Sequence, residues 1–163
     1  MSVSARIHCP RRPGLVDLSP AAMVVLGAAR DWFDTGGQGP GLCLTLARAG
    51  LPAGAVARFA AALGLIGLSA CRAIDMRAPG SPGLSRDEGL LLIAVAALQS
   101  GEPWRAQRVA SEWLPPHLVP RVIASLAHFA AAFAAAGLRL PREPVDEAAL
   151  PPAWRPDRPP LLH

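Results

Sequence analysis

The hydrophobic pattern of this chain centres on a run of nine apolar residues, from Leu90 to Leu98. Ser85 lies before this run, and Glu88 lies three positions after Ser85. This is the spacing of a capping box, in which the serine and glutamate side chains satisfy backbone N–H groups at a helix start. A helix that is apolar on every side lies inside a bundle or a membrane, and this one is too short to span a bilayer. The pattern therefore predicts a buried central helix over 86–100, in which Asp87 and Glu88 serve the cap.

Apolar residues recur at helical spacing in five further segments, which are separated by Gly and Pro signals. Arg58 is the only charge between Leu51 and Cys71, so we expect the segment over 52–68 to be nearly as buried as the central helix. On the first helix we expect Arg30 and Asp34 to form a surface pair. The predicted helices cover about 20–34, 42–49, 52–68, 86–100, 103–114 and 118–136.

These segments predict an all-α, single-domain bundle of about six helices over residues 19–140, with irregular or orthogonal packing. Residues 1–18 are polar and interrupted by proline, so we expect a flexible N-terminal segment. Residues 141–163 contain seven prolines. They predict a Pro-rich C-terminal tail with polyproline character that is not a packed element, and whether Trp154 and Leu161-Leu162 tether it to the domain stays open.

The composition favours close helix packing, with 52% hydrophobic and only 17% charged residues. All sixteen basic residues are Arg, and they are spread along the chain. The net charge of +4 and the pI of about 10.1 therefore do not indicate a dense positive field.

The N-terminus has no signal-peptide pattern, and three distant cysteines fit reduced thiols, so we expect a cytoplasmic protein. The uncharged stretch 122–138 is interpreted as a buried helix, without stable membrane insertion.

Several signals occur in an order that resembles a family of short alphaproteobacterial proteins known only as a domain of unknown function. After an Ala-rich first helix come Cys71 ahead of a loop, Leu84-Ser85-x-Asp87-Glu88, Gly101, and Ala136-Gly137-Leu138-x-Leu140-Pro141. The likeness covers roughly residues 19–141. It implies an all-helical domain and no particular activity. The family tends to have several adjacent cysteines near the position of Cys71, where this chain has one.

The cysteines do not have the paired spacing of metal ligands. Cys43 and Cys71 are predicted to be small buried apolar residues. We expect no metal or other cofactor, and a redox role for Cys9, Cys43 and Cys71 stays open.

One face of the last predicted helix combines groups that could bind a small anion. Arg121, Ser125 and His128 follow one another at spacings of four and three residues. Trp154 stands beside a PxxP string at 156–159, a pattern recognised by peptide-binding domains. These four residues form the candidate interaction surface.

The sequence favours a non-catalytic helical interaction or scaffold protein that meets a protein partner or a second copy of itself. Scarce charge leaves apolar surface for such a contact, and no base, nucleophile and orienting group come together as an enzyme needs. The alternative is a nucleic-acid-associated regulator with a helix-turn-helix at about 103–136, in which Arg105, Arg108 and Arg121 contact phosphates. A recognition helix needs polar residues near its N-terminus, and residues 118–123 are mostly apolar.

Overall fold

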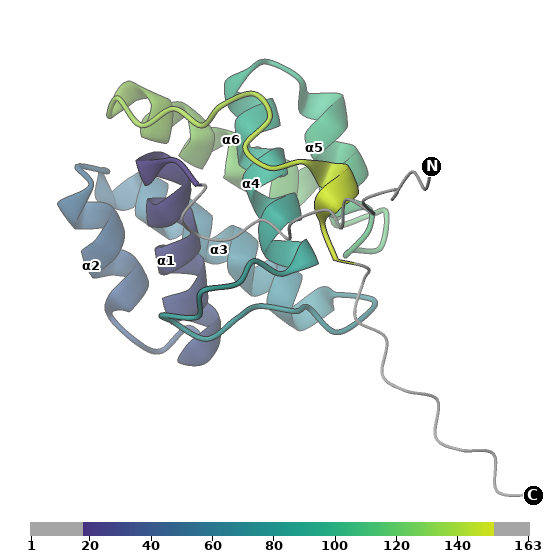
Figure 1. The fold of residues 1–163 in the computed structure, drawn as a ribbon, viewed down its shortest axis with the longest axis horizontal. Helices are drawn as coiled ribbons and strands as arrows, with labels where there is room; N and C mark the ends of the chain where they lie inside the picture. Colours follow the sequence, from purple (N-terminus) through teal and green to yellow (C-terminus); the bar gives the residue numbers. More distant parts are fainter. Residues whose placement is uncertain (1–17, 152–163) are drawn as a thin grey trace, which may run out of the picture.

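The computed structural model describes residues 18–151 as a bundle of six α-helices that cross at varied angles (Figure 1). This confirms the predicted all-α fold. A short 3₁₀-helix, Glu147–Ala149, follows the last α-helix. The α-helices are α1 (Pro20–Asp34), α2 (Gly41–Arg48), α3 (Ala53–Ser69), α4 (Arg86–Gln99), α5 (Pro103–Ala110) and α6 (Val119–Ala135).

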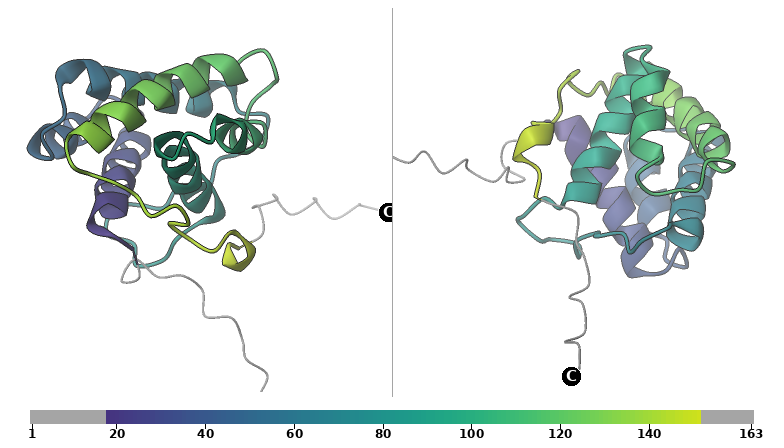
Figure 2. Two further views of the ribbon diagram at one scale, coloured as in Figure 1. Left: turned by 90° about the horizontal axis from the view of Figure 1, so that it is seen from above. Right: turned by 90° about the vertical axis from the view of Figure 1, so that its right-hand side faces the viewer.

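Helix α4 is the centre of the bundle, as its apolar pattern predicts. The capping box is present: the Glu88 N–H donates to Ser85 Oγ at 3.2 Å, and the Ser85 N–H donates to Glu88 Oε2 at 2.8 Å. Every residue from Asp87 to Ala97 is buried. Helices α1, α5 and α6 pack around α4 (Figure 2). Gly101 ends the element with a φ of +74°, a conformation that other residues rarely adopt.

Helices α3 and α6 form the most extensive helix–helix contact of the domain. The rings of Phe59 on α3 and Phe129 on α6 stack with centroids 4.2 Å apart. Phe133 extends the stack along α6, with centroids 5.2 Å apart. The stretch 122–138 thus contributes a core helix, as predicted, and no helix of residues 18–151 is long and apolar enough to cross a membrane.

The prediction that the segment 52–68 is nearly as buried as α4 is wrong. One side of α3 packs in the core, and its other side is open to solvent. Small residues such as Ala and Gly are tolerated on a surface, so a low charge content does not by itself indicate burial. The exposed side of α3 includes Gly54, Ala57, Arg58, Ala61, Gly67 and Leu68.

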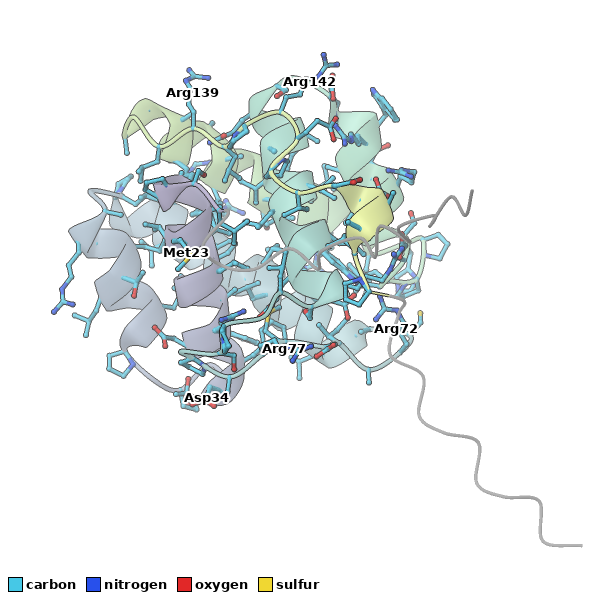
Figure 3. All side chains as sticks on the ribbon, in the orientation of Figure 1. Met23, Asp34, Arg72, Arg77, Arg139 and Arg142 are labelled. Carbon is cyan, nitrogen blue, oxygen red and sulfur yellow. The ribbon has the colours of Figure 1, made fainter. Side chains whose placement is uncertain are left out.

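The prediction of an unpacked tail is wrong for residues 141–150. Val145 and Leu150 are buried, and Leu150 lies on Gly89 of α4, where a Cβ would come within 2.4 Å of a leucine methyl group. The many prolines argue against an α-helix in this segment, but they do not prevent two of its apolar side chains, Val145 and Leu150, from packing on the domain. Ion pairs hold the segment to the end of α4 and to α5: Arg142–Glu102, Arg105–Glu143 and Arg108–Glu147, with Arg142 labelled in Figure 3. The predicted flexible segment 1–18 falls almost wholly outside the described residues, as does the rest of the tail.

Candidate functional site

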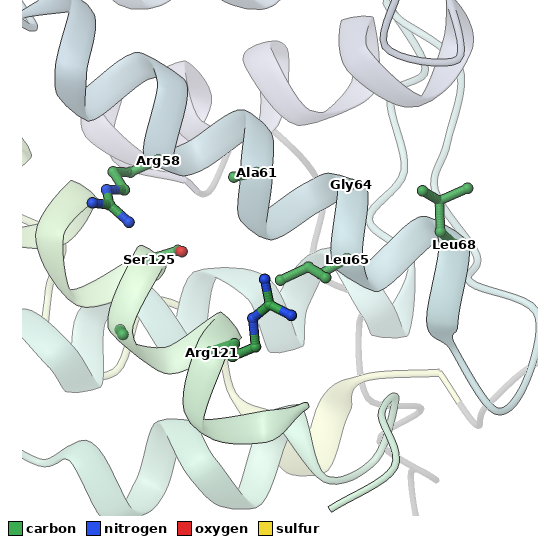
Figure 4. Close-up of a pocket in the computed structure, with 8 residues that line it drawn as sticks. Arg58, Ala61, Gly64, Leu65, Leu68, Arg121 and Ser125 are labelled. Carbon is green, nitrogen blue, oxygen red and sulfur yellow. The ribbon is translucent and has the colours of Figure 1, made fainter. Parts of the chain in front are cut away.

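A groove of about 540 Å³ runs between the outer sides of α3 and α6 (Figure 4). It exists because both helices present small residues there, which leave a shallow channel between the two backbones. The same two helices are joined in the core by the stacked rings of Phe59 and Phe129, which do not line the groove. The lining residues are Arg58, Ala61, Gly64, Leu65 and Leu68 from α3, and Arg121, Ala124 and Ser125 from α6.

Two arginines contribute the charge of this groove. Arg58 extends from α3 and Arg121 from α6, and the guanidinium group of each reaches toward the opposite helix (Figure 4). Neither has an acidic partner within 4 Å in the described part of the chain. By contrast, Arg30, Arg72 and Arg86 are each paired with a carboxylate. The groove therefore brings together two uncompensated positive charges.

Within residues 18–151, the two helices that form the groove and the segments next to them in sequence have no carboxylate. Residues 35–74, which include α2 and α3, have no Asp or Glu, and neither do residues 113–142, which include α6. The acidic residues of the described chain lie at the end of α1, in the loop before α4, at the head of α4, in the segments before and after α5, and in the segment 143–147. The described carboxylates are thus unevenly distributed along the chain, and none of them lies on α2, α3 or α6.

Ser125 lies on the α6 wall of the groove with 7% of its surface exposed. Its hydroxyl makes no hydrogen bond within residues 18–151, whereas the hydroxyl of Ser111 donates to the Gln107 carbonyl one turn earlier in its own chain segment. No fully buried side-chain polar atom of the described residues lacks a partner. The Ser125 hydroxyl therefore opens to the groove, where it can donate to a ligand.

The other end of the groove is aliphatic. Leu65 is half-buried, and Leu68 is 89% exposed, the most exposed large apolar side chain among the described residues. The groove thus joins a cationic, hydrogen-bonding end to an apolar end.

Of the four residues in the predicted interaction surface, the fold brings Arg121 and Ser125 together in this groove. His128 is exposed on α6 and does not line it, and Trp154 lies outside the described residues. The sequence analysis did not predict that Arg58 lies in the same groove as Arg121. Arg58 is the only charged residue of α3, and a single charge on an otherwise uncharged helix indicates a position that faces solvent.

The prediction that Cys43 and Cys71 are buried is wrong, because both thiols are exposed. Cys43 borders a second, apolar groove of about 300 Å³ between α2 and α3. Cys71 follows α3, where its N–H donates to the Trp113 carbonyl at 2.7 Å and its side chain is left outside. Within residues 18–151 no group of three or more His, Cys, Asp or Glu side chains is placed to hold a metal ion. Cys9 lies outside that range.

The two carboxylates at the head of α4, Asp87 and Glu88, also form ion pairs with arginines from other parts of the chain. Arg30 is 3% exposed and contacts both oxygens of Glu88, at 2.7 and 2.9 Å. The predicted surface pair of Arg30 with Asp34 is therefore wrong, since the guanidinium group points into the bundle. Arg30 also donates to the carbonyls of Ser81 and Gly83.

Asp87 organises the other half of this network. Both of its oxygens accept from Arg72, at 2.6 and 2.9 Å, and it also accepts from the Trp113 indole and the Asp75 N–H. Burial by itself would raise the pKa of the Asp87 carboxyl. These hydrogen bonds and the Arg72 charge outweigh it and lower the pKa below the usual 3.8. The network joins α1, α4, the loop between α3 and α4, and the segment after α5, so we interpret it as structural.

Comparison with protein-family models, with curated proteins and with solved structures finds no match to this chain. The α3–α6 groove is therefore interpreted from its own chemistry.

Proposed function

We propose that this protein is a non-catalytic helical interaction protein that binds an acidic surface of a partner protein through the face formed by α3 and α6. The observation behind the proposal is the pair of uncompensated arginines, Arg58 and Arg121, on a face without any carboxylate. Complementary charge speeds association and excludes wrong partners. The small exposed residues of α3 let a second backbone approach closely, as a helix docked in a groove requires.

Self-association through this face is less well supported than binding to a different protein. Two copies that met face to face would bring four guanidinium groups together without a counter-charge. The acidic partner would have to come from another molecule or from the opposite side of a second copy.

A nucleic-acid-associated role through a helix-turn-helix over 103–136 is the weaker alternative. The exposed positions in the first two turns of α6 are Pro120, Arg121 and Ala124. Only Arg121 offers a group that could contact a base edge or a phosphate, whereas a recognition helix presents several polar side chains.

The test compares affinity capture from cell extract by the full chain and by the double variant Arg58→Gln/Arg121→Gln. Arg77→Gln is the matched control, because Arg77 is exposed and has no ion pair within residues 18–151 but lies away from the groove. We expect a partner that is retained by the wild type and the control and lost by the double variant. Its affinity is then measured with both proteins purified. A partner retained equally by all three, or no partner with measurable affinity, would reject the proposal.

A further inference from the structure

We infer that the α3–α6 groove binds a carboxylate attached to an aliphatic group, which in a protein partner is an Asp or Glu side chain next to a Leu, Ile or Val. This inference rests on the proposed function and specifies the chemistry of the partner's contact. Three observations support it: the facing guanidinium groups, the unpartnered Ser125 hydroxyl, and the aliphatic end of the groove.

The guanidinium groups provide the affinity for an anion. Arg58 and Arg121 have like charges, so their mutual repulsion is relieved when a negative group sits between them. A guanidinium group donates two parallel hydrogen bonds that match the geometry of a carboxylate. Because the arginines come from two helices, an anion at this position would be held from both sides.

Ser125 adds a donor that no group of the described chain uses. Its position one turn after Arg121 places the hydroxyl on the wall between the two guanidinium groups, as Figure 4 shows. The stacked rings of Phe59 and Phe129 fix the spacing of the helices. The two helices that carry the donors are therefore held at a fixed spacing before a ligand arrives, which reduces the ordering cost of binding.

The aliphatic end distinguishes a carboxylate on an apolar chain from a nucleic-acid phosphate. Leu65 and Leu68 continue the groove beyond Arg121, and Leu68 is almost fully exposed in the free protein. A carboxylate followed by methylene or methyl groups would cover these side chains, whereas a phosphate followed by a sugar would leave them in water.

The inference is tested by NMR titration of the full chain with hexanoate, acetate, 1-hexanol, inorganic phosphate and a short DNA duplex as probes. We expect saturable shifts of the Arg58 and Arg121 Nε–H signals and of the Ser125 amide signal with hexanoate. Hexanoate should bind about tenfold more tightly than acetate because its chain covers the leucines. Hexanol and phosphate should bind more weakly than hexanoate. Equal or tighter binding of phosphate or of a short DNA duplex would overturn the inference in favour of a nucleic-acid surface.

Variants locate the binding to the groove. Arg121→Gln should weaken hexanoate binding by about tenfold, and Ser125→Ala by a few-fold. Leu68→Ser should weaken the binding of hexanoate and leave that of acetate unchanged. Arg77→Gln serves as the control and should change neither. Since Arg77 and Arg121 are exposed and make no ion pair in the described chain, their variants should keep the wild-type melting temperature. Hexanoate binding that is insensitive to all groove variants would overturn the inference.

The outcome of this titration is separable from that of the proposed function. A partner captured through Arg58 and Arg121, combined with no saturable hexanoate binding, would reject the carboxylate–aliphatic site and retain the interaction face. Saturable hexanoate binding combined with no captured partner would retain the carboxylate–aliphatic site and reject the interaction face.

Discussion

Replacement of Glu88 by glutamine provides the sharpest test of how the head of the central helix is held together. The carboxylate accepts two hydrogen bonds from Arg30, at 2.7 and 2.9 Å. It accepts two more from backbone N–H groups, those of Arg77 at 2.9 Å and Ser85 at 2.8 Å. Glutamine has nearly the same shape, but one of its two terminal atoms donates where Glu88 accepts. Glu88→Gln therefore places a donor against other donors and leaves the buried Arg30 charge without a counter-charge.

The size of the effect follows from burial. Arg30 and Glu88 are 3% and 0% exposed, so water cannot replace the lost contacts. Breaking a buried ion pair from one side costs about 3–5 kcal/mol. This is a large part of the roughly 5–15 kcal/mol by which a domain is stable. We expect the free energy of unfolding to fall by that amount and the urea midpoint to fall by at least about 1 M.

The measurement is urea unfolding followed by far-UV circular dichroism and tryptophan fluorescence. The matched control is Glu112→Gln, which breaks the half-exposed ion pair of Glu112 with Arg86. It should cost no more than about 1 kcal/mol, because solvent-accessible ion pairs contribute little to stability. A loss below about 1 kcal/mol for Glu88→Gln, the size of one ordinary hydrogen bond, would refute the reasoning. A Glu112→Gln variant as unstable as Glu88→Gln would also count against it.

Three further substitutions test neighbouring parts of the bundle. Because the pKa of Asp87 is lowered below 3.8, its stabilising contribution is present above that pH and is lost as the pH falls through the lowered value. Asp87→Asn should therefore reduce the urea midpoint at neutral pH and flatten its decline in acid. Leu91→Ala should cost about 2–5 kcal/mol in the same unfolding assay, since Leu91 is 1% exposed, and a negligible loss would contradict its central place. Gly89→Ala should displace Leu150, whose methyl group would lie 2.4 Å from the new Cβ. Limited proteolysis should then cleave residues 141–150 faster while helix content is unchanged, and unchanged cleavage would show that the leucine simply rotates aside.

Most of the fold could be predicted because its signals are local. The capping box at Ser85, the glycine at position 101 and the apolar repeats each depend on residues within a few turns of one another. The same reasoning was wrong about α3, because Ala and Gly are compatible with both core and surface. The prediction for the tail was wrong because a high proline content indicates only the absence of a helix. It does not show whether individual apolar residues, here Val145 and Leu150, pack on the domain.

The polar contacts could not be predicted, because they join residues far apart in the chain. Arg30 and Glu88 are 58 positions apart, and a nearer acid, Asp34, offered a plausible local partner. The groove has the same origin. Arg121 and Ser125 share a helix face by spacing, but Arg58 joins them only because α3 packs beside α6. Long-range pairing of this kind depends on topology, which helical periodicity does not specify.

The irregular segment between α3 and α4 has no helix of its own, but its backbone is anchored as firmly as a core element. The N–H groups of Asp75 and Arg77 donate to the Asp87 and Glu88 carboxylates, and the Ser85 hydroxyl donates to the Asp75 carbonyl. Amide hydrogens held in this way exchange with solvent only when the head of α4 comes apart. Native-state hydrogen exchange should therefore find these two loop amides opening together with the central helix, as one cooperative unit. The loop between α3 and α4 is therefore expected to move together with α4 and not to act as a hinge between the two helices.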